Sequence, residues 1–333
     1  MSDIRSAFVP SPGILKIIEA IKSQRGNTHR RCPPNILVTG KSGSGKTTLI
    51  EHLKNRFPRR TSESDDKDIV PVVVLSFPKD VSQLYMISSL LEQLGDPDYK
   101  ERDLDLAYKK LWKFLEDCEV EILLIDELHN IQRGLSRKVS PLARAFIKDI
   151  CTHTKVLMVG FGTEEAEMLL ETEPELDTRF QHFESMPVYS VYDGQRPVFR
   201  KYLEKLSAYL DVKNPEIIYQ GDFPERLYFV TRALPRTIAH LIDGAILKAS
   251  KAGRNKLINK DFEEAALALR PCRRQAKVFN LRSDKVYELV SKNAYKDPED
   301  YRSFEIVKDM FDQKGVFNDM VYQADKVVLG AKP

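Results

Sequence analysis

The sequence predicts an α/β protein with a parallel sheet flanked by helices, followed by a small all-helical domain. Up to about residue 190, short apolar strands alternate with amphipathic helices, a pattern typical of a parallel sheet covered on both faces. From about residue 191, helical patterns follow one another with no strand between them. At 333 residues, the chain is also long enough for two domains.

The first 34 residues form a lead-in to the sheet. Apolar residues at 14, 15, 17, 18 and 21 recur at helical spacing, and Pro12 stands where a first helical turn tolerates proline. Residues 35–190 then carry the alternation. We expect strands over 35–40, 69–77, 120–126 and 155–162, and helices over 45–57, 82–95, 104–118 and 140–153.

Residues 191–270 form the predicted helical domain. Its helices are expected over 195–210, 224–232, 235–253 and 259–269. The remaining tail, 271–333, is rich in charge and weaker in pattern, with a final helix over 303–315. Two interpretations of the tail stay open: a segment that docks a partner, and a dispensable, partly disordered end.

The composition is that of an ordinary soluble globular protein, with 42% apolar and 30% charged residues. A net charge of +3 does not by itself indicate a polyanion-binding protein. No stretch resembles a signal peptide or a membrane span, so we expect a cytoplasmic protein with no membrane partner. The cysteines have no metal-binding spacing and are expected to be buried thiols: Cys32, Cys118, Cys151 and Cys272.

A glycine-rich motif, GKSGSGKT, occupies residues 40–47 between a predicted strand and a predicted helix. This GxxxxGK[ST] pattern is the P-loop, in which backbone N–H groups and a helix N-terminus surround phosphate oxygens. Lys46 is expected to contact the β- and γ-phosphates of ATP, and the Thr47 hydroxyl to bind Mg²⁺. The predicted nucleotide-binding residues are Gly40, Lys41, Ser42, Gly43, Ser44, Gly45, Lys46, Thr47 and Thr48.

A second motif, EILLIDE at residues 121–127, is an apolar strand that ends in two carboxylates. Asp126 is the candidate metal-side residue, and Glu127 is placed to polarise a water molecule for attack on the γ-phosphate. A kinase that passes phosphate to a bound substrate has no need of such a glutamate. The motif therefore favours an ATPase that releases ADP and phosphate.

Hydrolysis also requires positive charge at the γ-phosphate, and two arginines have suitable contexts. Arg179 follows the fourth strand and a short helix, a position that faces the neighbouring subunit in ring ATPases. Arg236 opens a helix of the second domain, from which it could reach back to the nucleotide. Thr163, directly after the fourth strand, is the candidate sensor of the γ-phosphate. An arginine acting across an interface increases the rate by about 10³-fold or more.

These motifs resemble the AAA+ ATPases over about residues 8–265, with a P-loop core followed by a helical lid. More narrowly, the chain is similar to transposition regulators of the TniB/TnsC kind, which belong to bacterial mobile elements and imply a bacterial cytoplasmic protein. The narrower resemblance rests on AFVPSPGILKIIEAI (7–21), VVVLSFPKDVSQLYMISSLLEQLG (72–95), LLIDELHNI (123–131) and VGFGTEEAEMLLETEPELDTRF (159–180).

The resemblance implies an ATP-binding protein that forms a homo-oligomeric ring or filament on double-stranded DNA. Such a protein recruits a transposase to a marked site and links it to a TniQ-like target selector. It also implies that Phe8 and Val9 pack on the adenine. The candidate DNA contacts are sequence-independent phosphate contacts from loops: Lys79, Lys100, Arg102, Arg133, Arg137 and Lys138.

Other functions remain open at this point. A replication initiator or helicase loader would share the core, although such proteins usually append a helix-turn-helix domain, and none is evident in 271–333. A metabolic P-loop kinase is disfavoured by Glu127, Arg179 and the helical lid. A nucleotide-locked scaffold that hardly hydrolyses ATP is disfavoured by Lys46, Asp126 and Glu127 together.

Overall fold

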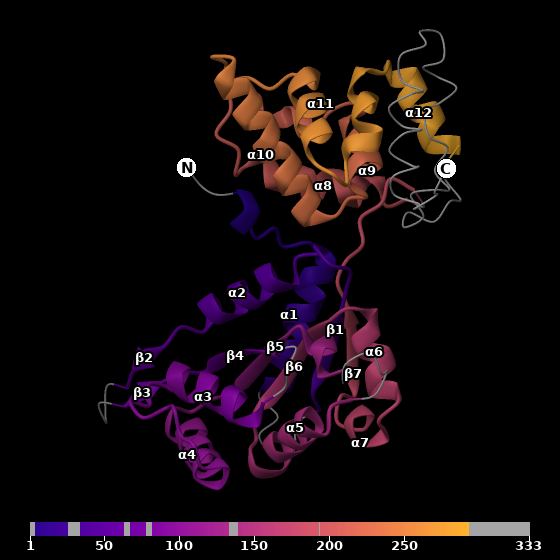
Figure 1. Ribbon diagram of the computed structural model, residues 1–333. Helices are drawn as coiled ribbons and strands as arrows, with labels where there is room; N and C mark the ends of the chain where they lie inside the picture. Colours follow the sequence, from indigo (N-terminus) through magenta and orange to yellow (C-terminus); the bar gives the residue numbers. More distant parts are fainter. Residues whose placement is uncertain are drawn as a thin grey trace, which may run out of the picture. The chain divides into compact units, whose positions relative to one another are not determined.

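The computed structural model describes residues 4–25, 34–62, 67–77, 82–132, 139–192 and 194–292. These residues divide into two units. The sheet unit comprises residues 8–188, and the helical unit comprises residues 4–7 together with residues 189 onward (Figure 1).

The sheet unit contains five parallel strands in the order β4-β5-β6-β1-β7. β1 lies between β6 and β7, so the loop that follows β1 leaves the sheet from its interior rather than from its rim. All five strands end at the same edge because they are parallel. Their bounds are β1 Ile36–Thr39, β4 Val72–Ser76, β5 Ile122–Asp126, β6 Leu157–Gly162 and β7 His182–Ser185.

Helices cover both faces of this sheet, as predicted (Figure 1). Alternate residues of β1 enter two separate cores: Ile36 and Val38 pack with α1 and α2, and Leu37 packs with the core that includes α3, α4 and α5. The helices of this unit are α1 Pro12–Arg25, α2 Lys46–Arg56, α3 Gln83–Leu94, α4 Leu104–Asp117, α5 Pro141–His153, α6 Glu164–Glu171 and α7 Pro174–Asp177.

The strands differ from the predicted ones in two places. The predicted strand over 69–77 is divided at Pro71: β3 (Asp68–Ile69) pairs in a hairpin with β2 (Arg60–Thr61), and β4 begins at Val72. Strand β7 was not predicted at all. It is an edge strand, and its side chains are exposed or half-buried, so its sequence lacks an apolar run. Backbone pairing with β1 holds it in the sheet.

The helical unit contains the four helices expected from the sequence, but it extends beyond residue 270. The short 3₁₀ helix η4 (Arg273–Asn280) and α12 (Ser283–Lys292) belong to it, and Cys272 and Phe279 are fully buried there. Arg226 fastens this extension by donating to the carbonyl of Leu281 at 2.8 Å. The four expected helices are α8 Arg196–Ser207, α9 Phe223–Thr231, α10 Pro235–Lys251 and α11 Asn259–Ala268.

The predicted lead-in, 1–34, is divided between the two units. The 3₁₀ helix η1 (Ile4–Ser6) belongs to the helical unit, where Ile4 is buried and Arg5 pairs with Asp243 of α10. Helix α1 belongs to the sheet unit. The predicted helix over 303–315 and the rest of the tail from 293 onward lie outside the described residues.

Three of the four cysteines are buried thiols, as predicted: Cys118, Cys151 and Cys272. Cys32 lies outside the described residues. Within the described ranges, no helix has both the length and the apolar character needed to cross a membrane.

Candidate nucleotide-binding and hydrolysis site

The P-loop joins the carboxyl end of β1 to the N-terminus of α2. Gly43 and Gly45 have φ angles of 83° and 99°, in the left-handed region that glycine tolerates best, and Gly45 is the N-cap of α2. A Cβ atom at Gly40 would lie 2.6 Å from the Cβ of Met186. Glycine is therefore required at each of these positions for the loop to curl tightly at the edge of the sheet.

The curled loop forms a phosphate cradle. Lys46 is buried, and its Nζ donates to the carbonyls of Gly40 at 2.6 Å and Lys41 at 3.1 Å. The Ser44 hydroxyl is buried and has no hydrogen-bond partner among the described residues. A lysine ammonium, an unsatisfied hydroxyl and the free N–H groups of a helix N-terminus are the donors that a phosphate group needs. These residues therefore fit a nucleotide triphosphate.

Thr47 and Asp126 face each other across the start of α2 and the end of β5. The Thr47 hydroxyl lies 3.4 Å from Asp126 Oδ2, and Asp126 Oδ1 accepts a hydrogen bond from the Glu127 N–H at 2.9 Å. Burial raises the pKa of Asp126 because it disfavours the charged carboxylate. A cation bound nearby would stabilise that charge. Mg²⁺ typically takes only one or two protein ligands, with water and phosphate oxygens for the rest. Thr47 and Asp126 therefore fit a Mg²⁺ ion.

Glu127 begins the turn that follows β5. Its φ of 54° is uncommon for a residue that carries a side chain. The Glu127 carboxylate lies 2.9 Å from Nε2 of His129, on the 3₁₀ helix η2 (Leu128–Ile131). Asn130 fixes this turn to the sheet by donating to the Phe77 carbonyl at 3.0 Å. His129 therefore holds the carboxylate that the sequence assigned to water activation.

Sequence reasoning did not single out His129 as a site residue. Its Nδ1 is buried and has no hydrogen-bond partner within the described part of the chain. The only available signal was a histidine two positions after an acidic pair, which carries no chemical meaning until the turn geometry is known.

Thr163 lies at the same edge of the sheet as the P-loop. It is the N-cap of α6, and the preceding Gly162 accepts a hydrogen bond from the Gly40 N–H at 3.1 Å. Cβ atoms at Gly160 and Gly162 would lie within 2.6 Å of side chains of η2 and α6. Close packing therefore requires glycine at the end of β6, and the first polar side chain beyond it is Thr163.

Arg179 lies at the opposite edge of the sheet. It follows α7, and its carbonyl accepts a hydrogen bond at 3.2 Å from the N–H of Asn35, the residue before β1. The four residues of β1 separate this edge from the P-loop by about 13 Å. The structure thus gathers Lys46, Thr47, Asp126, Glu127 and Thr163 at one edge and leaves Arg179 at the other.

Comparison with known proteins agrees with this geometry. A family model described as "Bacterial TniB protein" matches residues 5–189, more than half of the chain. The chain belongs to the bacterial TniB family. Its sequence matches no curated protein.

Solved structures identify the fold of this TniB-family chain. It is similar to the ORC1 protein of Aeropyrum pernix in complex with DNA, at 14% identity and a TM-score of 0.57, over 86% of this chain and 84% of that one. The ORC2 protein of the same organism gives 14% identity and 0.56, over 99% and 91%. Cdc6p of Pyrobaculum aerophilum gives 14% and 0.56, over 80% and 71%. The shared architecture confirms the predicted AAA+ fold.

Two further predicted nucleotide contacts lie near the start of the sheet unit. The Phe8 ring stacks on His52 of α2, with 3.6 Å between ring centroids and 7° between ring planes. Val9 is buried. Arg236, the second residue of α10, is exposed in the helical unit. The roles of Phe8 and Val9 at the adenine and of Arg236 at the γ-phosphate remain predictions.

Two of the six candidate DNA contacts lie in described parts of the structure. Lys100 and Arg102 are exposed in the segment between α3 and α4, and the Lys100 ammonium lies 5.3 Å from the Tyr99 ring centre. Neither forms an ion pair with another described residue. The other four lie outside the described residues: Lys79, Arg133, Arg137 and Lys138.

Proposed function

We propose that this TniB-family protein is an ATP-dependent, DNA-binding regulator of transposition. It binds ATP with Mg²⁺, assembles as a homo-oligomer on duplex DNA, and hydrolyses ATP to ADP and phosphate. The assembly marks a target site, recruits the transposase and connects it to a TniQ-like target selector. Support comes from the family membership and from the geometry of the P-loop edge.

One observation carries the proposal: the hydrolytic residues are divided between the two edges of the sheet. Lys46, Thr47, Asp126 and Glu127 lie at the carboxyl edge, whereas Arg179 lies about 13 Å away at the amino edge. An arginine in that place cannot serve the nucleotide of its own chain, but it is available to a neighbouring protomer. The site is then complete only in an oligomer.

The residues divide the work of hydrolysis as follows. Lys46 holds the β- and γ-phosphates, and Thr47 and Asp126 hold Mg²⁺, which neutralises phosphate charge when bound. Glu127 orients a water molecule in line with the γ-phosphate, and Arg179 of a neighbouring protomer stabilises the charge that develops on it. Thr163 and Arg236 sense the γ-phosphate, and Phe8 and Val9 border the adenine.

Binding to DNA is proposed to be weak for each protomer and strong for the assembly. The chain has 52 basic and 49 acidic residues, so no large general attraction to DNA is expected. Lys100 and Arg102 offer phosphate contacts from the sheet unit. A few such contacts from each protomer add up once many protomers engage one duplex.

Electron microscopy of the purified protein tests the proposal. With duplex DNA, Mg²⁺ and ATP, we expect rings or filaments on the DNA, and without ATP we expect none. Protein that stays monomeric with nucleotide, Mg²⁺ and DNA all present would refute the proposal. DNA without nucleotide and nucleotide without DNA are the matched controls.

Arg179→Ala is expected to bind ATP normally and to hydrolyse it about 10³-fold more slowly, because the γ-phosphate loses its cation from the neighbour. Mixing this variant with Lys46→Ala should restore part of the activity, since an intact P-loop then meets an intact Arg179. Phosphate release measures both effects. The exposed Arg60 provides a control, and Arg60→Ala should retain full activity. Mixtures that stay inactive although both variants enter the same oligomers would count against a role for Arg179 across the interface.

A further inference from the structure

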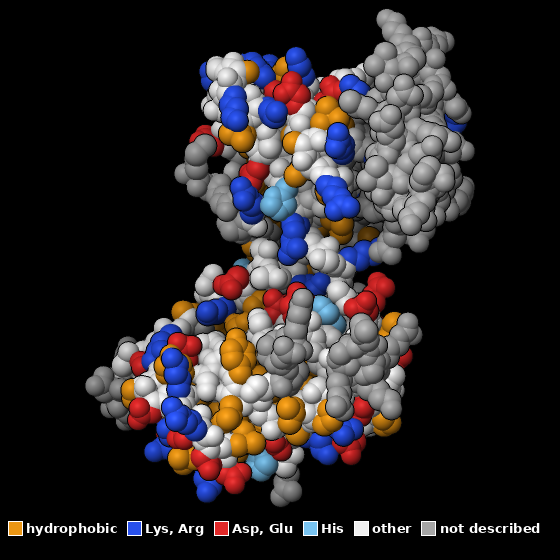
Figure 2. Space-filling model, in the orientation of Figure 1, with side chains coloured by type: hydrophobic (Ala, Val, Ile, Leu, Met, Phe, Trp, Pro, Cys, Tyr) orange, Lys and Arg blue, Asp and Glu red, His pale blue; other side chains and the backbone are white. Residues whose placement is uncertain are grey.

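The connection between α10 and α11 carries an unbalanced positive charge. Residues 248–260 (KASKAGRNKLINK) contain four lysines and one arginine and no acidic residue, in a chain whose basic and acidic residues nearly cancel. Figure 1 shows where the C-terminal end of α10 is connected to α11. In Figure 2, Lys and Arg side chains gather over this part of the helical unit, with a few acidic side chains among them. A sixth cation, Lys213, joins this segment because its N–H donates to the Asn255 carbonyl at 2.9 Å.

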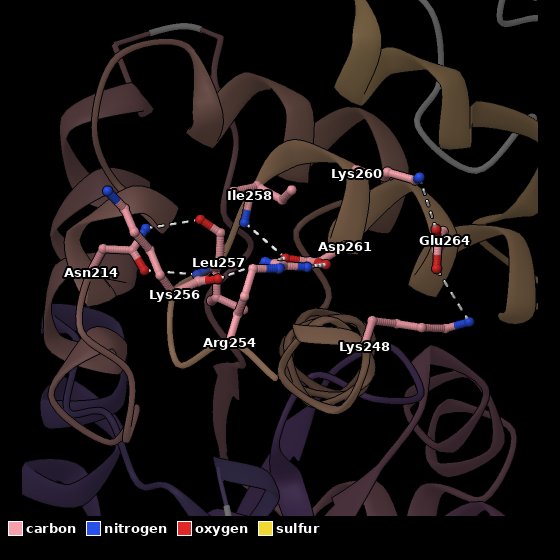
Figure 3. Close-up of polar contacts among 9 residues, drawn as sticks. All are labelled: Asn214, Lys248, Arg254, Lys256, Leu257, Ile258, Lys260, Asp261 and Glu264. Atoms are coloured by element: carbon pink, nitrogen blue, oxygen red, sulfur yellow. Dashed lines mark hydrogen bonds and ion pairs between the residues drawn. The ribbon is translucent and has the colours of Figure 1, made fainter. Parts of the chain in front are cut away.

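This connection is held in one conformation by its own polar contacts (Figure 3). The Asn214 side chain bonds both backbone groups of Leu257, at 3.0 and 2.8 Å. The Arg254 guanidinium makes a two-point contact with the buried Asp261 carboxylate at 2.9 and 2.6 Å, and Asp261 also accepts from the Ile258 N–H at 2.9 Å. These contacts fix the backbone of the connection, and the lysine side chains extend from this fixed backbone.

Most of these lysines have no anionic partner in the described part of the helical unit. Lys248 and Lys260 share Glu264, at 3.6 and 3.9 Å. Lys213, Lys251 and Lys256 are exposed and form no ion pair with any residue in the described ranges. We name the six cations the basic turn: Lys213, Lys248, Lys251, Arg254, Lys256 and Lys260. Among the residues that the structure describes, two carboxylates form ion pairs with them: Asp261 and Glu264.

We propose that the basic turn binds the phosphate backbone of duplex DNA. Several like charges close together on one turn attract a polyanion, and lysine ammonium groups contact phosphates without reading sequence. The inference rests on the proposed assembly on DNA and adds a contact from the helical unit. An acidic protein surface is the alternative occupant, since Ile258 beside the lysines is 41% exposed.

The experiment measures how DNA affinity depends on salt. The full chain with Mg²⁺ and a non-hydrolysable ATP analogue is titrated onto a labelled duplex at several salt concentrations. The test variant replaces Lys213, Lys251 and Lys256 with Ala. The control replaces Arg200, Lys201 and Arg273, also exposed in the helical unit, and so changes the net charge by the same amount. Binding of a fluorescent ATP analogue verifies that both variants are folded.

We expect the test variant to lower the slope of log K against log salt by about 2–3, or roughly one per lost phosphate contact. At moderate salt its affinity should fall roughly 10- to 100-fold. The control should retain the slope. An unchanged slope in the test variant, with normal DNA binding by the wild type, would overturn the inference and leave the proposed function intact; the turn would then suit an acidic protein. Equal losses in both variants would also overturn it. A wild type that binds no DNA would refute the proposed function itself.

Discussion

Glu127→Gln is expected to bind ATP with near-normal affinity and to hydrolyse it about 10²- to 10⁴-fold more slowly. Glutamine keeps the size and the polar contact to His129, but its amide cannot accept a proton from water. Because ATP then persists at the interface between protomers, the oligomers on DNA should become more stable. Phosphate release measures the rate, and electron microscopy measures the assembly.

The matched control is Glu116→Gln, an exposed glutamate near the end of α4, before β5 begins. It changes the charge by the same amount away from the turn after β5 and should leave hydrolysis unaffected. Normal phosphate release from Glu127→Gln would remove Glu127 from the hydrolytic role. In that case another group would have to orient the water.

Lys46→Ala is expected to lose ATP binding and DNA-dependent assembly together. A hydrogen bond to a charged group contributes about 1.5–3 kcal/mol, and Lys46 is placed to contact two phosphates. The loss of both contacts should weaken ATP binding by at least ~100-fold. Fluorescent ATP binding measures the first effect and electron microscopy with DNA the second.

The control for this variant is Lys54→Ala, an exposed lysine on the same helix α2. It should bind ATP and assemble as the wild type does. Filaments formed by Lys46→Ala at wild-type protein concentration would show that assembly does not depend on nucleotide. The proposed coupling between the P-loop and DNA would then be wrong, even with the fold unchanged.

Local sequence was sufficient to predict the P-loop, the acidic pair and most of the strands and helices. The P-loop depends on glycines at positions that only glycine fits, and its chemistry is confined to eight consecutive residues. The apolar run of 122–125 followed by Asp126 and Glu127 likewise places two carboxylates at a strand end. In both cases, residues that are adjacent in the sequence determine the backbone conformation and the position of the functional groups, so the sequence is enough to predict them.

Contacts between distant residues could not be predicted from sequence. Strand β7 lies at the rim and is held by backbone pairing with β1, so its side chains carry no pattern. The helical unit continues past residue 270 because Phe279 is buried in it and Arg226 holds the Leu281 carbonyl. Burial of this kind depends on a partner surface supplied from elsewhere in the chain.

The sequence by itself determined which groups could hold a triphosphate, because donors, glycines and a strand–helix junction coincide within one short segment. Only the tertiary structure decided where the remaining groups lie. It placed Arg179 at the far edge of the sheet, brought His129 against Glu127, and joined Lys213 to the lysines beyond α10. The reason is geometric. In a parallel sheet, the amino ends and the carboxyl ends of the strands are separated by the length of the strands. Which of these ends a residue lies near is decided only when the sheet forms.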